Sequence, residues 1–139
     1  MDPKEAQKLI LGVEARSAEE LIKHQRGPGE RFIFSDDKNN PEGNIYVIVR
    51  FVENVDRPEA HVAPHEHEYE SMNLFKGNNP DMTGLECEMF LDGQWYPIHS
   101  PQAVRIPPHL IHTYRLISGS GEYWNIVLTP GANYNQTIR

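Results

Sequence analysis

The sequence predicts a small all-β domain, and three observations support this fold class. Beyond residue 29 the chain consists of short runs rich in Val, Ile, Tyr and Phe, separated by clusters of Gly, Pro, Asn and Asp. The pair Asp92-Gly93 joins two such runs, and both residue types accept the positive φ angles of a tight hairpin turn. Many short strands within about 110 residues favour a sandwich or a closed barrel over a parallel sheet.

The expected strands follow directly from these runs. They cover residues 31–35, 44–53, 59–63, 68–76, 85–91, 94–98, 102–106, 111–117 and 122–129.

The first residues instead carry two helix signals. Residues 2–5 (Asp-Pro-Lys-Glu) place a capping Asp before Pro and an early Glu, and residues 17–20 (Ser-Ala-Glu-Glu) form a capping box. The second pattern ends by residues 27–29 (Gly-Pro-Gly). We therefore expect one or two short helices in an N-terminal helical segment, residues 1–28, followed by a barrel at residues 29–139.

Composition narrows the classes of partner. A chain of 139 residues with 38% apolar and 24% charged side chains fits one globular domain with its own core. The net charge of −7 comes without any stripe of Lys and Arg, which argues against nucleic acid or an anionic membrane as the main partner. A small-molecule substrate or another protein remains.

Location and redox chemistry are constrained in the same way. No apolar stretch approaches the roughly twenty residues of a membrane span, and the N-terminus lacks the apolar core of a signal peptide. We therefore expect a cytoplasmic protein. Cys87 is the only cysteine, so a metal would have to be held by nitrogen and oxygen.

The histidines suggest such a metal site. His65 and His67 are two apart in an expected strand, so both imidazoles project from one face. Glu70 follows three residues later, and His112 comes after a turn that two prolines would stiffen. An isolated surface histidine is ordinary, but this combination is much rarer. Three imidazoles and a carboxylate suit Fe, Mn, Zn, Ni or Cu, with water or substrate at the open positions.

These residues also resemble the two sequence motifs of the cupins. The first motif contains H-x-H, a later Glu and then x6-G, which residues 65–77 match from His65 to Gly77. The second contains P-x-G-x2-H, which residues 107–112 match with His109 in place of glycine. The resemblance covers about residues 43–130. It implies an antiparallel double-stranded β-helix, the jelly-roll barrel, with one metal inside and pairing into a homodimer.

One departure leaves two registers open. Only two residues separate His67 from Glu70, where the family has three or four. In one register His65 takes the place of the second histidine, the first falls on Ala63, and His61 or His67 stands in. We favour the other register, because the side chains of an H-x-H pair converge without special geometry. Its metal ligands are His65, His67, Glu70 and His112.

Neighbouring polar residues are candidates for catalysis. His109 on the turn could move protons, since an imidazole titrates near neutrality, although a plain surface residue is the more common case for a histidine on a turn. Glu70 could share that role. Arg105 could pair with a substrate carboxylate, with a surface salt bridge as the ordinary alternative. Glu66 and Glu68 alternate with the histidines and are expected to be solvated.

These features predict a metal-dependent enzyme that acts on a small polar oxygenated metabolite. The metal would act as a Lewis acid in isomerase or lyase chemistry, or would bind O2 in a dioxygenase if it were iron. The alternative is a metal-containing module that binds or senses a small molecule without catalysis, and a structural role with a vestigial metal is a third reading. The apolar run at residues 45–49 would be an aggregation risk as a bare sheet edge, which favours a homodimer that covers it.

Overall fold

The computed structural model describes residues 1–16, 30–56, 59–60 and 63–133. No helix in these ranges is long and apolar enough to span a membrane. In chain order the elements are α1 (Pro3–Gln7), β1 (Glu14–Arg16), β2 (Glu30–Ser35), β3 (Ile45–Val55), β4 (Glu59–Ala60), β5 (Ser71–Gly77), β6 (Leu85–Leu91), β7 (Gln94–His99), β8 (Gln102–Ile106), β9 (His112–Leu128) and a 3-10 helix (Pro130–Ala132).

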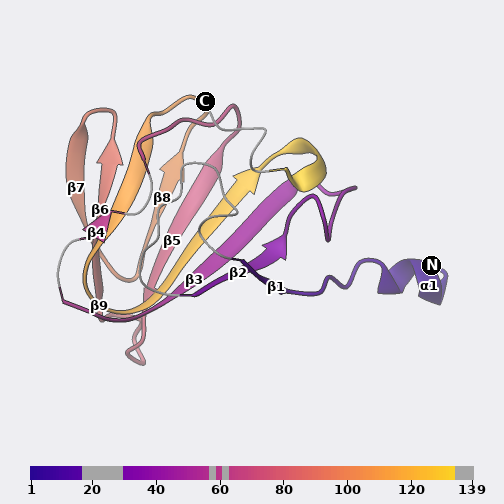
Figure 1. Cartoon of the computed structure of the whole chain (residues 1–139), viewed down its shortest axis with the longest axis horizontal. Helices are drawn as coiled ribbons and strands as arrows, with labels where there is room; N and C mark the ends of the chain where they lie inside the picture. Colours follow the sequence, from indigo (N-terminus) through magenta and orange to yellow (C-terminus); the bar gives the residue numbers. More distant parts are fainter. Residues whose placement is uncertain (17–29, 57–58, 61–62, 134–139) are drawn as a thin grey trace.

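The long strand β9 belongs to both halves of the barrel (Figure 1). Its second half pairs with β3 on one side and β5 on the other, which gives the order β1-β2-β3-β9-β5-β8. Its first half pairs with β4 and β6, and β6 pairs in turn with β7. All these pairings are antiparallel, and the fold is the jelly roll that the sequence predicts.

Two glycines allow β9 to cross from one half to the other. Gly119 has φ +99°, and a Cβ there would lie 2.0 Å from the backbone oxygen of Gly84. A Cβ on Gly121 would lie 2.1 Å from the backbone oxygen of Lys76. Both distances are far below van der Waals contact, so the neighbouring chain can approach only where β9 has no side chain.

The main core lies between the two halves. Alternate residues of β6 and the first half of β9 point inward and meet Phe75 and Tyr123 from the other half. Cys87 lies in this core, and burial raises the pKa of its thiol to about 12. The core comprises Val52, Phe75, Leu85, Cys87, Met89, Ile98, Ile106, Tyr114, Leu116 and Tyr123.

Most expected strands are present, with three instructive differences. The strands expected at 111–117 and 122–129 are one continuous strand, because Gly119 and Gly121 let the chain bend without a turn. The run at residues 45–49 lies in β3 between β2 and β9, so it is not a bare edge. The short strand β1 pairs with β2 and was not expected.

At the N-terminus, α1 matches the first helix signal, with the Asp2 side chain accepting a hydrogen bond from the backbone N–H of Lys4 at 3.0 Å. The second helix, expected from Ser17, lies outside the described residues. The division of the chain at residue 28 therefore stays a prediction.

The bend of β9 gives a direct test. Gly119→Ala should lower the free energy of unfolding by about 3 kcal/mol or more, because it adds a backbone clash to an unfavourable φ. Gly93 is the matched control: its φ is +100°, but nothing lies within 4 Å of its Cβ position. Gly93→Ala should cost only about 1 to 2 kcal/mol. Equal losses in urea unfolding would show that the close approach to Gly84 is unimportant.

Candidate metal centre

Backbone hydrogen bonds bring the two histidine segments together. The N–H of His65 donates to the carbonyl of His112 at 3.0 Å, and the N–H of His112 donates to the carbonyl of His65 at 2.8 Å. The N–H of His109 donates to the carbonyl of His67 at 2.8 Å. The segment before β5 is thus held alongside the turn that leads into β9, although His67 and His112 are 45 residues apart in sequence.

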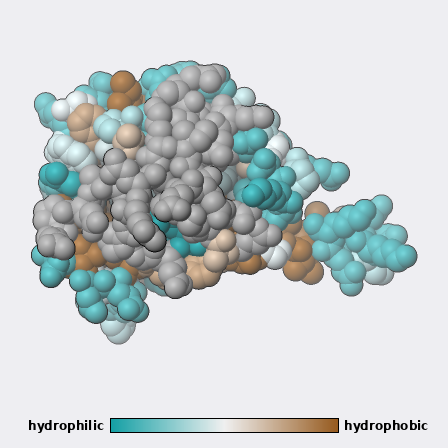
Figure 2. Space-filling model, in the orientation of Figure 1, coloured by the Kyte–Doolittle hydropathy of each residue, from teal (hydrophilic) through white to brown (hydrophobic). Residues whose placement is uncertain are grey.

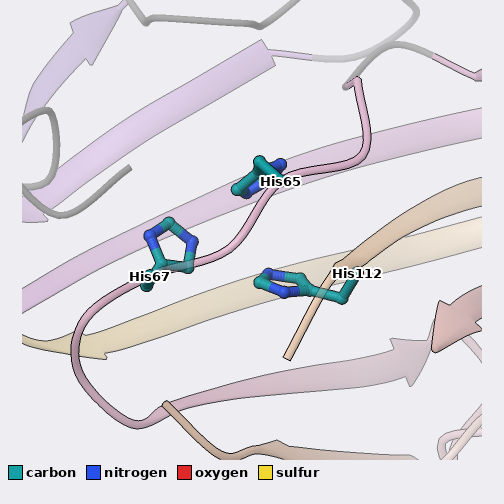
Figure 3. Close-up of side chains that lie close together, drawn as sticks. All are labelled: His65, His67 and His112. Carbon is teal, nitrogen blue, oxygen red and sulfur yellow. The ribbon is translucent and has the colours of Figure 1, made fainter. Parts of the chain in front are cut away.

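The three imidazoles converge on one point inside the barrel (Figure 3). One ligand atom from each ring lies within 4.8 Å of the others, and all three residues are buried. The ring centroid of His65 lies 4.8 Å from that of His67 and 4.7 Å from that of His112. Three imidazoles in this arrangement are a known donor set for a divalent transition metal.

The local hydrogen bonds orient two of these rings for a metal. Nδ1 of His65 lies 2.7 Å from the carbonyl oxygen of Ala63, and Nδ1 of His112 lies 2.8 Å from that of Leu110. A carbonyl only accepts, so Nδ1 carries the proton and Nε2 keeps its lone pair. Burial lowers the pKa of His112, which favours the neutral form that binds metals. The residues present therefore fit a metal ion.

Glu70 lies apart from the three histidines. Its carboxylate accepts a hydrogen bond from Nε of Arg105. In β5 the buried residues are Ser71, Asn73 and Phe75, whereas Met72 is exposed, so the strand alternation directs the next residue inward rather than Glu70. Glu70 is not in the group of possible ligands that the three histidines form among the described residues, and its role as a ligand stays a prediction.

His109 occupies an unusual backbone conformation. Its φ is +67°, in the left-handed region, at the position where the second motif carries glycine. Its side chain is exposed, and Nδ1 lies 3.4 Å from a carboxylate oxygen of Glu66. Non-glycine residues in this region are uncommon and cluster at functional sites. The glycine position in the motif is thus explained by geometry, and histidine holds it at an energetic cost.

Other charged side chains, on β6, β7 and β9, pair with one another. Arg115 donates to Glu88 at 2.7 Å, and its guanidinium lies 4.2 Å from the ring centroid of Trp95. His99 pairs with Glu86 in the same way on the β6–β7 hairpin. These groups are engaged with one another and not with the three histidines.

Two buried arginines were not foreseen from the sequence. Arg31 and Arg50 are 5% and 1% exposed, and both point into the barrel from β2 and β3. The alternation of side chains along a strand did indicate these positions. Arg31 shares a strand face with Ile33, and Arg50 shares one with Ile48. Arginine is mostly a surface residue, so this alternation was not read as an inward position.

Comparisons with known proteins concern the fold. No protein-family model matches the chain, and no curated protein is similar to it in sequence. Among solved structures, oxalate decarboxylase from Bacillus subtilis matches with a TM-score of 0.57 at 10% identity, over 90% of this chain but only 31% of that one. A variant of PAC13 from Streptomyces, solved with uridine, matches with a TM-score of 0.53 at 13% identity, over 84% and 83% of the two chains.

An RmlC-like cupin from Shewanella frigidimarina is also similar, with a TM-score of 0.48 at 14% identity over 82% of this chain and 88% of that one. Similarity at identities this low is evidence for a shared fold and not for a shared activity. The antiparallel jelly roll, the histidine motifs within it and the likeness to oxalate decarboxylase and PAC13 in fold agree with one another. The chain is a small protein with the cupin fold.

Proposed function

We propose that the protein is a metal-dependent enzyme that acts on a small polar oxygenated metabolite. The observation that carries this proposal is the convergence of three buried imidazoles, two of them oriented through Nδ1 by backbone carbonyls. His65, His67 and His112 would hold one divalent ion among Fe, Mn, Zn, Ni and Cu. When bound, such an ion supplies a Lewis acid for isomerase or lyase chemistry, and iron also supplies a site for O2.

The chain's own residues would handle protons and charge around the ion. His109 is the best candidate for proton transfer, because it stands on the turn before His112 and close to Glu66. A strained backbone retained at such a place supports a role for its side chain. Glu70 and Arg105 form a second, more exposed pair, and either member could act on a substrate once the pair opens.

The alternative is a binding or sensing module without catalysis. Oxalate decarboxylase is an enzyme by name, and PAC13 was solved with uridine, so barrels of this fold serve both chemistry and small-molecule binding. Turnover of a ligand separates the two functions, because a sensor binds its ligand and releases it unchanged.

We also propose a cytoplasmic homodimer. The arm that carries α1 extends away from the barrel, and Figure 2 shows hydrophobic surface where it leaves (Figure 1). Leu9 and Ile10 on this arm are 69% and 80% exposed. Apolar side chains this exposed are a liability in a monomer, and a second copy would cover them.

The metal prediction concerns the three histidines. Purified protein should carry close to one transition metal per chain, and His65→Ala and His112→Ala should each remove most of it, since removing a ligand from a three-imidazole set leaves too few donors. Elemental analysis of untagged protein is the measurement. Unchanged metal content in both variants would contradict the site.

Glu70→Gln is the matched control for this measurement. A three-histidine site keeps its metal in this variant, because the carboxylate is engaged with Arg105. A fall in affinity of about tenfold or more would instead assign Glu70 to the coordination sphere. The same preparations, incubated with hydroxy acids, keto acids and sugar derivatives with and without air, test for turnover.

The role of His109 can be separated from its backbone strain. His109→Gly should raise the free energy of unfolding by about 1 kcal/mol, because glycine adopts the left-handed conformation freely, whereas His109→Ala should not. Both variants should keep the metal and lose turnover, because both lack the imidazole. Full activity in His109→Gly would show that the side chain takes no part in the reaction.

A substitution in the N-terminal arm tests whether the protein forms a homodimer. Ile10→Asp should shift the protein from dimer to monomer in light scattering, because a buried carboxylate would oppose the contact. Tyr96→Asp is the control, since Tyr96 is an exposed residue of the β6–β7 hairpin at 45% exposure. A wild type that is monomeric at all concentrations would exclude the dimer.

A further inference from the structure

Two positive charges face each other inside the barrel. Arg31 on β2 and Arg50 on β3 are direct register partners, and both side chains are more than nine-tenths buried. Like charges directly opposite one another in a sheet are destabilising, and burial makes each guanidinium more costly. An anion bound between the two guanidinium groups would offset this cost.

The partners of Arg31 do not supply this offset. Its Nη2 is buried and has no hydrogen-bond partner among the described residues. Burial and the charge of Arg50 lower the pKa of Arg31, and the groups that act in the opposite direction are the phenols of Tyr114, Tyr123 and Tyr46. No carboxylate is among the charges that act on this guanidinium in the described part of the chain.

Tyr114 connects the arginine pair to the metal centre. Nη1 of Arg50 donates to the hydroxyl of Tyr114 at 3.1 Å, and Tyr114 stacks on Tyr123 with ring centroids 3.8 Å apart. Tyr114 follows His112 by two residues on β9, and both are buried. Residues at this spacing share one face of a strand about 7 Å apart. Tyr114 therefore links Arg50 to the strand that carries His112.

The inner face of β5 carries further polar atoms. Ser71 and Asn73 on β5 are 2% and 1% exposed, and neither Oγ of Ser71 nor Oδ1 of Asn73 has a hydrogen-bond partner among the described residues. The amide of Asn73 donates to Asn125 on β9 at 3.0 Å. Buried polar atoms without partners are rare, and several of them on one inner face indicate a surface that binds a polar ligand.

We propose that Arg31 and Arg50 bind an oxyanion group of the substrate, a carboxylate or a phosphate ester, inside the barrel. This inference deepens the proposed function, because it assigns a charge class to the metabolite that the metal centre would act on. A guanidinium presents planar N–H donors that match a carboxylate or phosphate, and an anion between two such groups cancels their repulsion. The oxygenated part of the same molecule would then lie toward the histidines.

The test measures anion binding in protein stripped of metal, so that no metal can bind the probe. Malonate serves as the carboxylate probe, methyl phosphate as the phosphate probe and malonamide as a neutral isostere of malonate, in calorimetry and thermal shift at constant ionic strength. Wild type should bind one of the two anions and not malonamide. The anion with the lower Kd identifies the class of oxyanion.

Arg31→Met should weaken anion binding on the order of 30-fold or more, because a buried partner of the anion is lost. Its Tm without ligand should equal or exceed that of wild type, since one of two facing buried charges is gone. A purely structural arginine would instead lower the Tm on removal. Arg115→Met, which removes an arginine paired with Glu88 outside this cluster, should bind the anion as wild type does.

Arg31→Lys keeps the test valid if Arg31→Met does not fold. This variant retains the positive charge but lacks the planar pair of N–H donors of a guanidinium. Its affinity for the anion should therefore be measurable but lower than that of wild type. The proposal is overturned if metal-free wild type binds neither anion, or if the folded Arg31 variants bind as tightly as wild type. Metal content, measured separately on the same preparations, decides the proposed metal centre independently.

Discussion

The structure depends on the passage of β9 through both halves of the barrel. One strand carries His112 and Tyr114 at its start and Tyr123 and Asn125 near its end. Because residues two apart share a face, the first pair lines one wall of the interior and the second pair lines the other. The two walls contact each other where Tyr114 stacks on Tyr123. A change in the bend would move the metal centre and the polar interior relative to each other.

Local signals in the sequence were sufficient for the hairpins and for the histidine pair. The turn at Asp92-Gly93 needs no distant contact, and Asp92 and Gly93 indeed have φ of +48° and +100°. The strand period also predicted the convergence of His65 and His67. In the structure the two residues lie between β4 and β5, where backbone bonds to His112 and His109 hold them. His112 joined the set because a proline-stiffened turn precedes it, and the resemblance to the cupins supported it. The backbone bonds between His65 and His112 show how the two distant segments are paired.

The pairing of strands that are distant in sequence determines which side chains face inward, and this could not be predicted from the sequence. The side chain that faces inward at the start of β5 is set by pairing with β8 and β9, and this pairing buries Ser71 and leaves Glu70 with Arg105. Spacing within residues 65–70 contains no information on that pairing. The inward arginines escaped notice for a related reason: β2 and β3 were recognised as strands, but which of their faces is buried depends on the opposite half of the barrel.

The charges of the polar interior affect how an ion and a substrate would bind together at the site. A divalent ion at the histidines and two guanidinium groups in the same buried interior would repel one another in a medium of low dielectric constant. An anionic substrate placed between them would attract both, so its binding would strengthen the hold on the ion, and the ion would strengthen the hold on the substrate. Such coupling would favour an ion and a substrate that are bound together over either one alone. A polar and cationic interior that costs stability in the empty barrel would then be stabilised in the loaded one.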